Sequence, residues 1–455
     1  MPNKIVKFID LFSGMGGIRL GFEQAFQTAG YKTRCVLTAE IKDAALTALK
    51  RNFPDDEVSG DISKIETKDI KDFDFLLAGF PCQAFSVAGK QRGFADTRGT
   101  LFFEVERILR DKKPYGFILE NVEGLVTHDK EKPEDDIGRT LATILQSLGA
   151  MGYKVTWKVL DAQNFGLAQC RNRIYIVGTK KEKLSLDNFP ITTATFAPVM
   201  EHGLDTIDNE FSRKLLARYD VNELYGKSIK DKRGGDNNIH SWDLGIKGDV
   251  SDDERKLLNQ LLKERRKKHW AKVIGIDWMD GMPLTADQIR TFYDRDNLGE
   301  MLDHLVELGY LVYEHPKKRV AKETGSQTRT IYERIPDETK PKGYNIVAGK
   351  LSFEFSRILD PNGITPTMVA MDMETIGVID GNGIRNLTLK EGLGLFGYPP
   401  DYSLEDFEKS DKDKRLGFDL LGNTVCVPVI KAVAGRLEES YTKSRKKGGV
   451  KNAKK

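Results

Sequence analysis

Cysteine is scarce in this chain, and its few copies stand far apart. The 455 residues include four cysteines, Cys35, Cys82, Cys170 and Cys426. None belongs to a CxxC pair, so the sequence indicates neither a zinc site nor a disulfide framework. Four thiols in a chain of this length suit a reducing compartment. We therefore expect a cytoplasmic protein without a metal centre.

Long hydrophobic runs are also missing. No segment reaches the roughly 20 apolar residues that a membrane-spanning helix needs, and Met1–Asp10 lacks the pattern of a signal peptide. The hydrophobic fraction of 39% and the charged fraction of 31% are ordinary for a soluble globular protein. The length allows one large core and a second domain.

Charge of one sign is in small excess only, since the formal net charge is +3. The basic residues nevertheless cluster in three places: Arg265, Arg266, Lys267 and Lys268; Lys317, Lys318 and Arg319; and the tail from Lys443 to Lys455. A single basic run is most simply a solvated surface. Their repetition favours a polyanionic partner.

The first 180 residues alternate between short apolar runs and amphipathic stretches. We predict a helix at 18–29, and strands at 5–11, 34–39, 73–78, 116–119, 155–160 and 173–177. Strands that alternate with helices indicate a mostly parallel, doubly wound α/β sheet. In such a sheet, functional groups collect at the carboxyl ends of the strands. The loops after Leu11, Ala39, Ala78 and Leu119 should therefore lie on one rim.

A glycine turn and two carboxylates on this rim suggest a nucleoside site. Phe12-Ser13-Gly14-Met15-Gly16-Gly17 follows the first strand, and glycines there let a ligand approach the backbone closely. Alone, such a turn can serve tight packing only. Glu40 at the end of the second strand can accept both ribose hydroxyls, and Asp61 is placed to bond an adenine amino group. Together they favour a nucleoside cofactor over isolated surface acids.

A thiol and a carboxylate follow the next two strands. Cys82 stands in Gly79-Phe80-Pro81-Cys82-Gln83, and Glu120 in Glu120-Asn121-Val122. A buried structural thiol and a helix-capping acid are the alternative interpretations. A carboxylate beside a thiol on one rim can give acid–base help to a nucleophile. The glycine-rich basic stretch from Gln83 to Thr100 resembles a mobile loop that closes on a phosphate backbone.

Two arginines complete the set in Gln169-Cys170-Arg171-Asn172-Arg173. Alternate residues of a strand point to the same side, so Gln169, Arg171 and Arg173 are candidates to face one site. Arginines in such positions can hold a carbonyl oxygen or a phosphate.

These blocks, in this order and together with Gly422-Asn423-Thr424, resemble the ordered motifs of the DNA cytosine-C5 methyltransferases. The stretch from Cys82 to Phe103 is especially similar to the bacterial restriction-modification members. The resemblance covers almost the whole chain. It implies a Rossmann-like methyltransferase sheet that uses S-adenosylmethionine, with an inserted, smaller target-recognition domain.

The resemblance also implies a role for each motif residue. Cys82 would add to cytosine C6, Glu120 would bond N3, Arg173 would hold O2, and Arg171 would support the loop or the developing charge. The cofactor would be bound by Phe12, Gly14, Gly16, Gly17, Glu40, Asp61, Pro81, Asn423 and Val425. The cytosine must leave the stacked helix for this chemistry, which requires no metal.

We expect the catalytic and cofactor-binding domain at 1–180, completed by 392–455, and the target-recognition domain at 181–391. Two expected helices near 285–293 and 298–308, followed by a strand ending at Glu314, suggest a winged-helix-like segment at 255–320. The DNA contacts would come from Gln83, Lys90, Arg92, Arg98, Arg265, Arg266, Lys267 and Lys268.

The partner is expected to be double-stranded DNA, methylated by a monomer of bacterial or phage origin, with any cognate restriction endonuclease acting separately. Three alternatives remain open. A tRNA-methylating member of the same family would share the catalytic blocks. A catalytically dead DNA-binding module would be expected to lack Cys82 or Glu120, and a nicotinamide-dependent dehydrogenase would carry GxGxxG, which the glycine turn does not match.

Overall fold

The computed structural model describes residues 5–81, 101–231, 235, 237–322, 331–347 and 353–452. The chain divides into two compact units. Unit 1 comprises Met1–Glu201, Asp360–Glu374 and Leu387–Lys455, and unit 2 comprises His202–Leu359 and Thr375–Asn386. Unit 1 thus extends beyond residue 180. It also includes segments 360–374 and 387–391, which we predicted to belong to the second domain.

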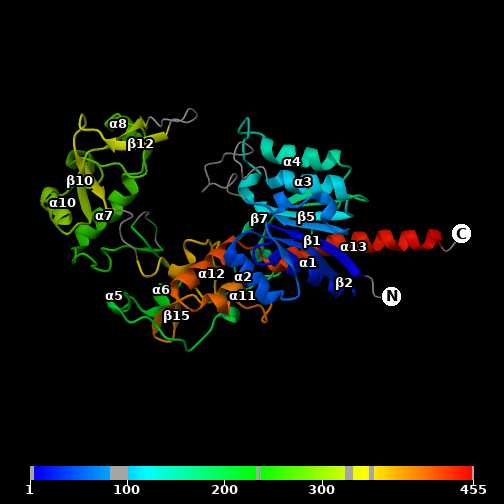
Figure 1. The fold of residues 1–455 in the computed structure, drawn as a ribbon. Coiled ribbons are helices and arrows are strands. Elements are labelled where there is room, and N and C mark those ends of the chain that lie inside the picture. Colours follow the sequence, from blue (N-terminus) through cyan, green and yellow to red (C-terminus); the bar gives the residue numbers. More distant parts are fainter. Residues whose placement is uncertain are drawn as a thin grey trace. The chain divides into compact units, whose positions relative to one another are not determined.

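Unit 1 is built on a seven-stranded sheet with the order β3-β2-β1-β4-β5-β7-β6 (Figure 1). Strands β1 to β5 run parallel, whereas β7 is antiparallel to both β5 and β6. The strands are β1 (Ile5–Leu11), β2 (Lys32–Ala39), β3 (Val58–Ser59), β4 (Phe75–Gly79), β5 (Gly116–Val122), β6 (Lys154–Asp161) and β7 (Asn172–Thr179).

Helices cover both faces of this sheet. Helices α3 and α4 lie on one face, and α1 and α13 lie on the other (Figure 1). The helices of unit 1 are α1 (Gly17–Thr28), α2 (Asp43–Asn52), α3 (Leu101–Lys112), α4 (Arg139–Ala150), α11 (Leu389–Leu395), α12 (Asp411–Asn423) and α13 (Val427–Asn452). The predicted doubly wound α/β fold is confirmed.

Local patterning explains why the strands were predictable. β5 reads GFILENV, and its first six residues are buried, as expected for a central strand covered by helices on both faces. Phe102, Val105, Ile108 and Leu109 of α3 recur at helical spacing and pack into the same apolar core. The parallel direction of β1, β2, β4 and β5 then sets which edge of the sheet carries the loops that follow them.

One helical stretch among the described residues, Asp411–Lys446, contains an 18-residue window apolar enough to cross a membrane by length and composition. Of that window, 61% is buried inside the protein. Tyr441 of α13 packs against Phe26, Phe75 and Tyr115. This apolar character is that of a helix packed into the core of unit 1.

Unit 2 contains a five-stranded sheet with the order β16-β15-β14-β8-β9 and its own apolar core around Phe355, Ile358 and Ile379. The strands of this sheet are β8 (Ser228–Ile229), β9 (Asn238–Ile239), β14 (Arg357–Ile358), β15 (Ile376–Asp380) and β16 (Gly383–Asn386). Helices α5 (Glu210–Arg218) and α6 (Val221–Leu224) precede β8.

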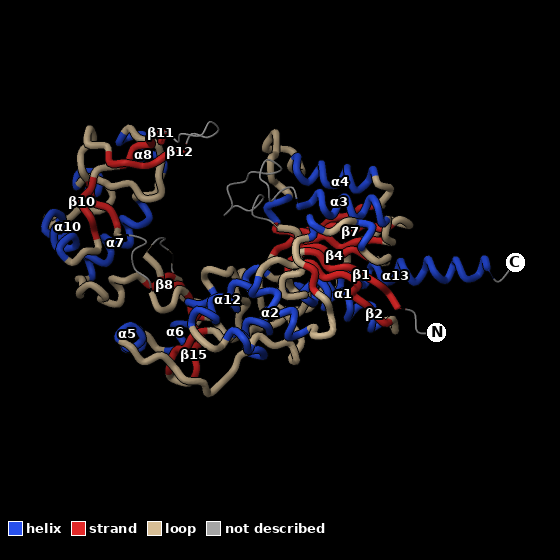
Figure 2. Tube along the Cα trace, in the orientation of Figure 1, coloured by secondary structure: helices blue, strands red, loops and turns tan. Residues whose placement is uncertain are grey.

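A second apolar core in unit 2 is built from residues of four helices. Figure 2 shows the fold of this part of the chain. The elements are α7 (Asp252–Glu264), α8 (Lys268–Ile274), α9 (Ala286–Arg290), α10 (Leu298–Glu307), β10 (Leu311–Glu314), β11 (Lys317–Lys322), β12 (Ile331–Pro336) and β13 (Gly343–Ile346). Strand β13 pairs antiparallel with β10 and also bridges Leu284 through Tyr344, while β11 and β12 form a separate hairpin. The helices expected near 285–293 and 298–308 correspond to α9, which is shorter than expected, and α10, and β10 ends at Glu314 as expected. The winged-helix assignment of 255–320 stays a prediction.

Candidate active site

The strand register brings the predicted motif loops to one edge of the sheet. Leu11 at the end of β1 is in register with Ala39 of β2 and with Ala78 of β4. Gly79 at the end of β4 is in turn the register partner of Glu120 in β5. The residues after these four strands therefore share the carboxyl rim.

The glycine turn after β1 adopts a backbone that few residues tolerate. Phe12, Gly14 and Gly16 have φ values of 54°, 53° and 78°, in the left-handed region that favours glycine. Phe12 is not a glycine, and this conformation carries local strain of the kind found at binding sites. A Cβ on Gly14 would meet nothing within 4 Å. The open space at this position fits a ligand that lies against the backbone.

Glu40 holds the turn in this shape. Its Oε2 accepts a hydrogen bond from the Gly14 N–H at 2.7 Å, and its Oε1 accepts from the N–H groups of Ile41 and Lys42 at 2.7 and 2.9 Å. Each carboxylate oxygen has two lone pairs. Oε2 can therefore accept a ribose hydroxyl while it keeps its bond to Gly14.

Asp61 lies near Glu40 along the rim because the Glu40 N–H donates to Ser59, two residues before Asp61. Its Oδ1 accepts hydrogen bonds from the N–H and the hydroxyl of Ser63 at 3.0 and 2.7 Å. These bonds lower the pKa of Asp61. The side chain is an ionised acceptor, as the predicted contact to an amino group requires.

The C-terminal part of unit 1 closes over the glycine turn. A Cβ on Gly17 would come within 2.6 Å of Tyr398 Oη and 2.8 Å of Val425 Cγ2. Tyr402 donates from its hydroxyl to the carbonyl of Met15 at 2.6 Å. Val425 is thus beside the turn, as expected, and Gly17 is required for this close packing. The two tyrosines are contacts that no local motif announced.

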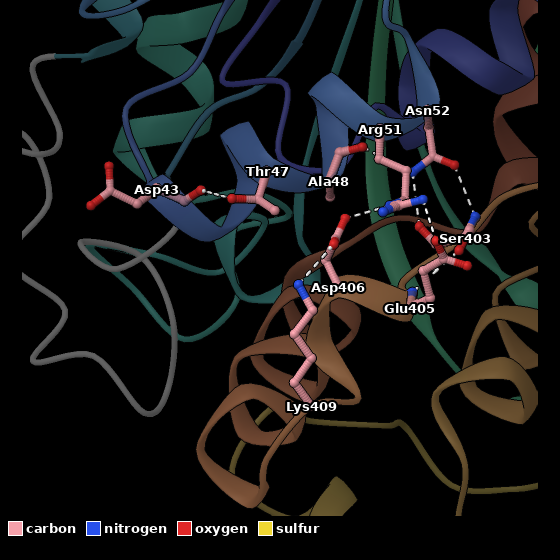
Figure 3. A network of polar contacts seen from close by, with 9 residues as sticks. All are labelled: Asp43, Thr47, Ala48, Arg51, Asn52, Ser403, Glu405, Asp406 and Lys409. Carbon is pink, nitrogen blue, oxygen red and sulfur yellow. Dashed lines mark hydrogen bonds and ion pairs between the residues drawn. The ribbon is translucent and has the colours of Figure 1, made fainter.

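A polar network holds this closing segment against α2 (Figure 3). Arg51 of α2 bonds both Glu405 and Asp406. Asn52 exchanges two hydrogen bonds with the backbone of Ser403, at 2.9 and 2.8 Å. Because Tyr402 precedes Ser403 directly, the network fixes the tyrosine that bonds Met15.

Asn423 takes a different place from Val425. It is exposed at the end of α12 and donates from Nδ2 to the carbonyl of Asp419 at 2.7 Å. This bond belongs to the helix end. The observed contacts of Asn423 are structural ones, whereas those of Val425 are at the rim.

Glu120 is clamped beside the end of β4. The adjacent Asn121 donates from Nδ2 to the Phe80 carbonyl at 3.1 Å, and a Cβ on Gly79 would lie 3.6 Å from Glu120 Oε2. These contacts hold the end of β4, Gly79 and the following Phe80, beside Glu120 and Asn121. Cys82 follows Pro81 directly but lies outside the described residues, as do Gln83, Lys90, Arg92 and Arg98.

The Glu120 carboxyl is nearly buried and pairs with Arg173, whose Nε lies 3.3 Å from Oε1. Burial raises the pKa of Glu120, while the charges of Arg173 and Arg171 oppose the rise. Desolvation favours the neutral acid. Glu120 is therefore suited to carry a proton, and Arg173 to hold a polar group beside it.

Arg171 has a role apart from this pair. Its Nη1 donates to the Met368 carbonyl at 2.8 Å, and its Nη2 donates to the carbonyls of Gly422 and Thr424 at 2.9 and 2.7 Å. Burial lowers the pKa of Arg171 to about 10. Gln169 likewise bonds backbone, at Leu395 and Met368. Of the three residues expected to face one site, Arg173 alone contacts Glu120, and the other two support loops.

The predicted DNA contact at Arg265 is wrong. Arg265 is only 4% exposed to solvent, and its Nη1 donates a hydrogen bond to Asn345 Oδ1 at 2.6 Å. Its neighbours differ from it. Arg266 pairs with Asp280 at 2.5 Å and Lys267 with Glu264 at 2.6 Å, while Lys268 is exposed at the start of α8. Arg265 is the C-cap of α7. It lies one helical turn after the buried Leu261 and Leu262, and its side chain is buried with them.

Potential metal ligands do not converge in the described ranges: no group of three or more histidine, cysteine, aspartate or glutamate side chains is placed to hold an ion there. Cys35, Cys170 and Cys426 are free thiols.

Comparisons with known proteins agree with the motif order. The family described as C-5 cytosine-specific DNA methylase matches residues 6–439. The chain is 60% identical over 432 residues to the Type II methyltransferase M.NlaIV of Neisseria lactamica, covering 95% of this chain and 98% of that protein. It is 40% identical over 454 residues to the Type II methyltransferase M.BanI of Aneurinibacillus aneurinilyticus, covering 94% of each.

Solved structures share the fold at low identity. A prophage-encoded protein of E. coli, described as a DNA modification methyltransferase, superposes with a TM-score of 0.50 and 20% identity, covering 95% of this chain and 99% of that one. The Entamoeba histolytica methyltransferase EhMeth gives a TM-score of 0.50 at 14% identity, covering 96% and 99%.

Proposed function

Since this chain belongs to the C-5 cytosine-specific DNA methylase family and is a DNA (cytosine-5)-methyltransferase, we propose that it methylates a flipped-out cytosine within a specific double-stranded DNA sequence. Unit 1 would bind the cofactor and carry out catalysis, and unit 2 would recognise the target. The observation that carries this proposal is the nearly buried Glu120–Arg173 pair, held beside the strand end that leads to Cys82.

The residues on the rim fit S-adenosylmethionine. The open space at Gly14 admits a ligand against the backbone, and Glu40 Oε2 can accept a ribose hydroxyl. Asp61 would accept from the adenine amino group, Phe12 and Pro81 would flank the cofactor, and Val425 would close the pocket behind Gly17. When bound, S-adenosylmethionine supplies the electrophilic methyl group that cytosine C5 accepts.

Cys82 would make that carbon nucleophilic. Its thiolate adds to C6, the π electrons of the C5–C6 double bond form a C4–C5 double bond, and the C4–N3 π electrons go to N3, which takes a proton or hydrogen bond from Glu120. A proton taken by N3 returns to Glu120 when the C4–N3 double bond re-forms after C5 has accepted the methyl group. The raised pKa of Glu120 favours the protonated acid that this step needs. Arg173 would hold the O2 oxygen. After methyl transfer a base removes the C5 proton, C5–C6 reforms its double bond, and Cys82 leaves as thiolate.

Arg171 would act by positioning. Its bonds to Met368, Gly422 and Thr424 tie three backbone carbonyls to the strand that carries Arg173. The cytosine must be extruded for Cys82 to reach C6, since base stacking covers that face in duplex DNA.

The relatives' names suggest the biological setting. M.NlaIV and M.BanI are named Type II methyltransferases, and we place this chain in a restriction-modification system of the same kind. It would act in the cytoplasm as a monomer, with any cognate endonuclease binding the DNA separately.

A covalent trap tests this proposal. The purified chain is incubated with S-adenosylmethionine and duplexes that carry 5-fluorocytosine at candidate sites, chosen by bisulfite sequencing of DNA from cells expressing it. Fluorine at C5 cannot leave as a proton, so the adduct should survive denaturation. Cys82→Ser should fold, bind cofactor and form no adduct. Methylation by Cys82→Ser at the parent rate, or modification of tRNA instead of DNA, would overturn the proposal.

A further inference from the structure

Charge is divided unequally over the part of unit 2 from α7 to β13, for which we predict a winged-helix arrangement. The exposed side of α10 carries Glu300, Asp303 and Glu307. In a helix-turn-helix arrangement, this second helix is the one that usually enters the major groove. Three carboxylates on it would face the phosphates that line both groove walls, and like charges repel. Helix α10 holds the position of a base-reading helix, but its negative charge is unfavourable for entering a DNA groove.

The β11–β12 hairpin has the opposite character. Arg319 and Arg334 are direct cross-strand partners, so both side chains leave the same face of the hairpin. Lys317 lies two residues before Arg319 and shares that face. Both arginines are exposed.

Hydrogen bonds join this hairpin to the segment around α8. Arg334 Nη2 donates to the carbonyl of Trp278 at 3.0 Å, and Trp278 Nε1 donates to the carbonyl of Arg266 at 2.9 Å. Helix α8 begins two residues after Arg266, and it lies beside β12 in Figure 1. Its Lys268 and Lys272 are four residues apart, share one side of the helix and are exposed.

We propose that the DNA backbone lies along a basic face formed by Lys268, Lys272, Arg319 and Arg334, and that α10 does not enter a groove. This inference rests on the proposed function, which supplies DNA as the ligand. Arginine pairs phosphate oxygens through two N–H groups, and such contacts add affinity without reading sequence. The basic face therefore grips the duplex, while sequence is read elsewhere.

Salt dependence of binding measures phosphate contacts directly. Each contact contributes about 0.9 to the slope of log K against log salt. For the full chain with Arg319→Gln and Arg334→Gln together, we expect the slope to fall by about 1.8, equally for duplexes with and without the methylation site. Lys268→Gln with Lys272→Gln should lower it by a similar amount. The methylated sequence should not change in either variant.

The matched control is Glu300→Gln with Glu307→Gln on α10, which also alters two exposed charges. It should keep the parent slope. Thermal unfolding with the parent's midpoint shows that a variant is folded. A parent slope in both basic-face variants, or tighter DNA binding by the α10 variant, would overturn the inference. If the parent itself neither methylates nor binds DNA, the proposed function fails instead; methylation with unchanged slopes refutes the basic face alone.

Discussion

Replacing Gly14 by alanine separates a cofactor contact from a purely structural glycine. Gly14 has φ of 53° and donates its N–H to Glu40, and a Cβ added there meets no protein atom within 4 Å. The protein should therefore tolerate the methyl group sterically. A cofactor lying against this backbone should not, because the methyl group would occupy its space.

Gly30 offers a matched control. It has φ of 83°, its added Cβ also meets nothing within 4 Å, and it follows α1 at the opposite end from the rim. Both substitutions place an L-residue in the left-handed region, which costs about 1–2 kcal/mol. We expect Gly14→Ala and Gly30→Ala to lose similar free energies of unfolding without ligand.

The two variants should differ once S-adenosylmethionine is added. At a concentration 100 times Kd the cofactor stabilises the parent by about 2.7 kcal/mol, and a tenfold rise in Kd at the same concentration reduces this to about 1.4 kcal/mol. Denaturant unfolding with and without cofactor, and calorimetric titration, measure both quantities. We expect the reduced stabilisation for Gly14→Ala and the parent value for Gly30→Ala. Equal cofactor affinities in the two variants would refute the assignment of the open space at Gly14.

Three further predictions follow from buried groups. Glu120→Gln should lower kcat strongly with little change in cofactor affinity. We expect the parent to lose activity as rising pH ionises Glu120 and the variant not to show this loss; the same pH profile in both would contradict the proton-donor role. Burial raises the pKa of Asp10 from 3.8 to about 7. Between these pH values the folded state therefore binds more protons than the unfolded state. The free energy of unfolding of the parent should fall as pH rises through this range, by at most about 1.4 kcal/mol per pH unit. Asp10→Asn should flatten this dependence in urea titrations, and parallel curves for parent and variant would refute the assignment. Arg265→Ala should cost about 1–3 kcal/mol of stability by leaving Asn345 without its buried donor. Exposed Lys268→Ala should stay within about 0.5 kcal/mol, and similar losses for the two variants would show that Arg265 is not a core residue.

Local patterns were enough to predict the sheet and the position of its motifs. The apolar run of β5 and the glycine turn after β1 each carry their signal within a few residues, and the parallel order then sets which loops share a rim. Glu40 was found in this way at the turn, whereas Val425 was named only through the family resemblance.

Tertiary contacts decided the rest. Arg265 stands in a basic run, yet its position at the end of α7 turns it into the core, which charge patterning cannot reveal. Tyr398 and Tyr402 approach the glycine turn from more than 380 residues further along the chain, with no motif that links them to it. Arg171 and Arg173 have the spacing of one strand face, but β7 begins at Asn172, so the alternation does not reach Arg171.

The bonds of Arg171 and Gln169 bear on how such a protein can change its specificity over evolution. Segment 360–374 belongs to unit 1 although unit 2 precedes and follows it, and Thr365 and Met368 are bound there by residues 168–171. The two segments of unit 2, 202–359 and 375–386, are therefore joined through a segment that is hydrogen-bonded within unit 1. With target recognition in unit 2, as proposed above, we expect relatives that methylate other sequences to differ mainly within 202–359 and 375–386, while unit 1 keeps its motif residues.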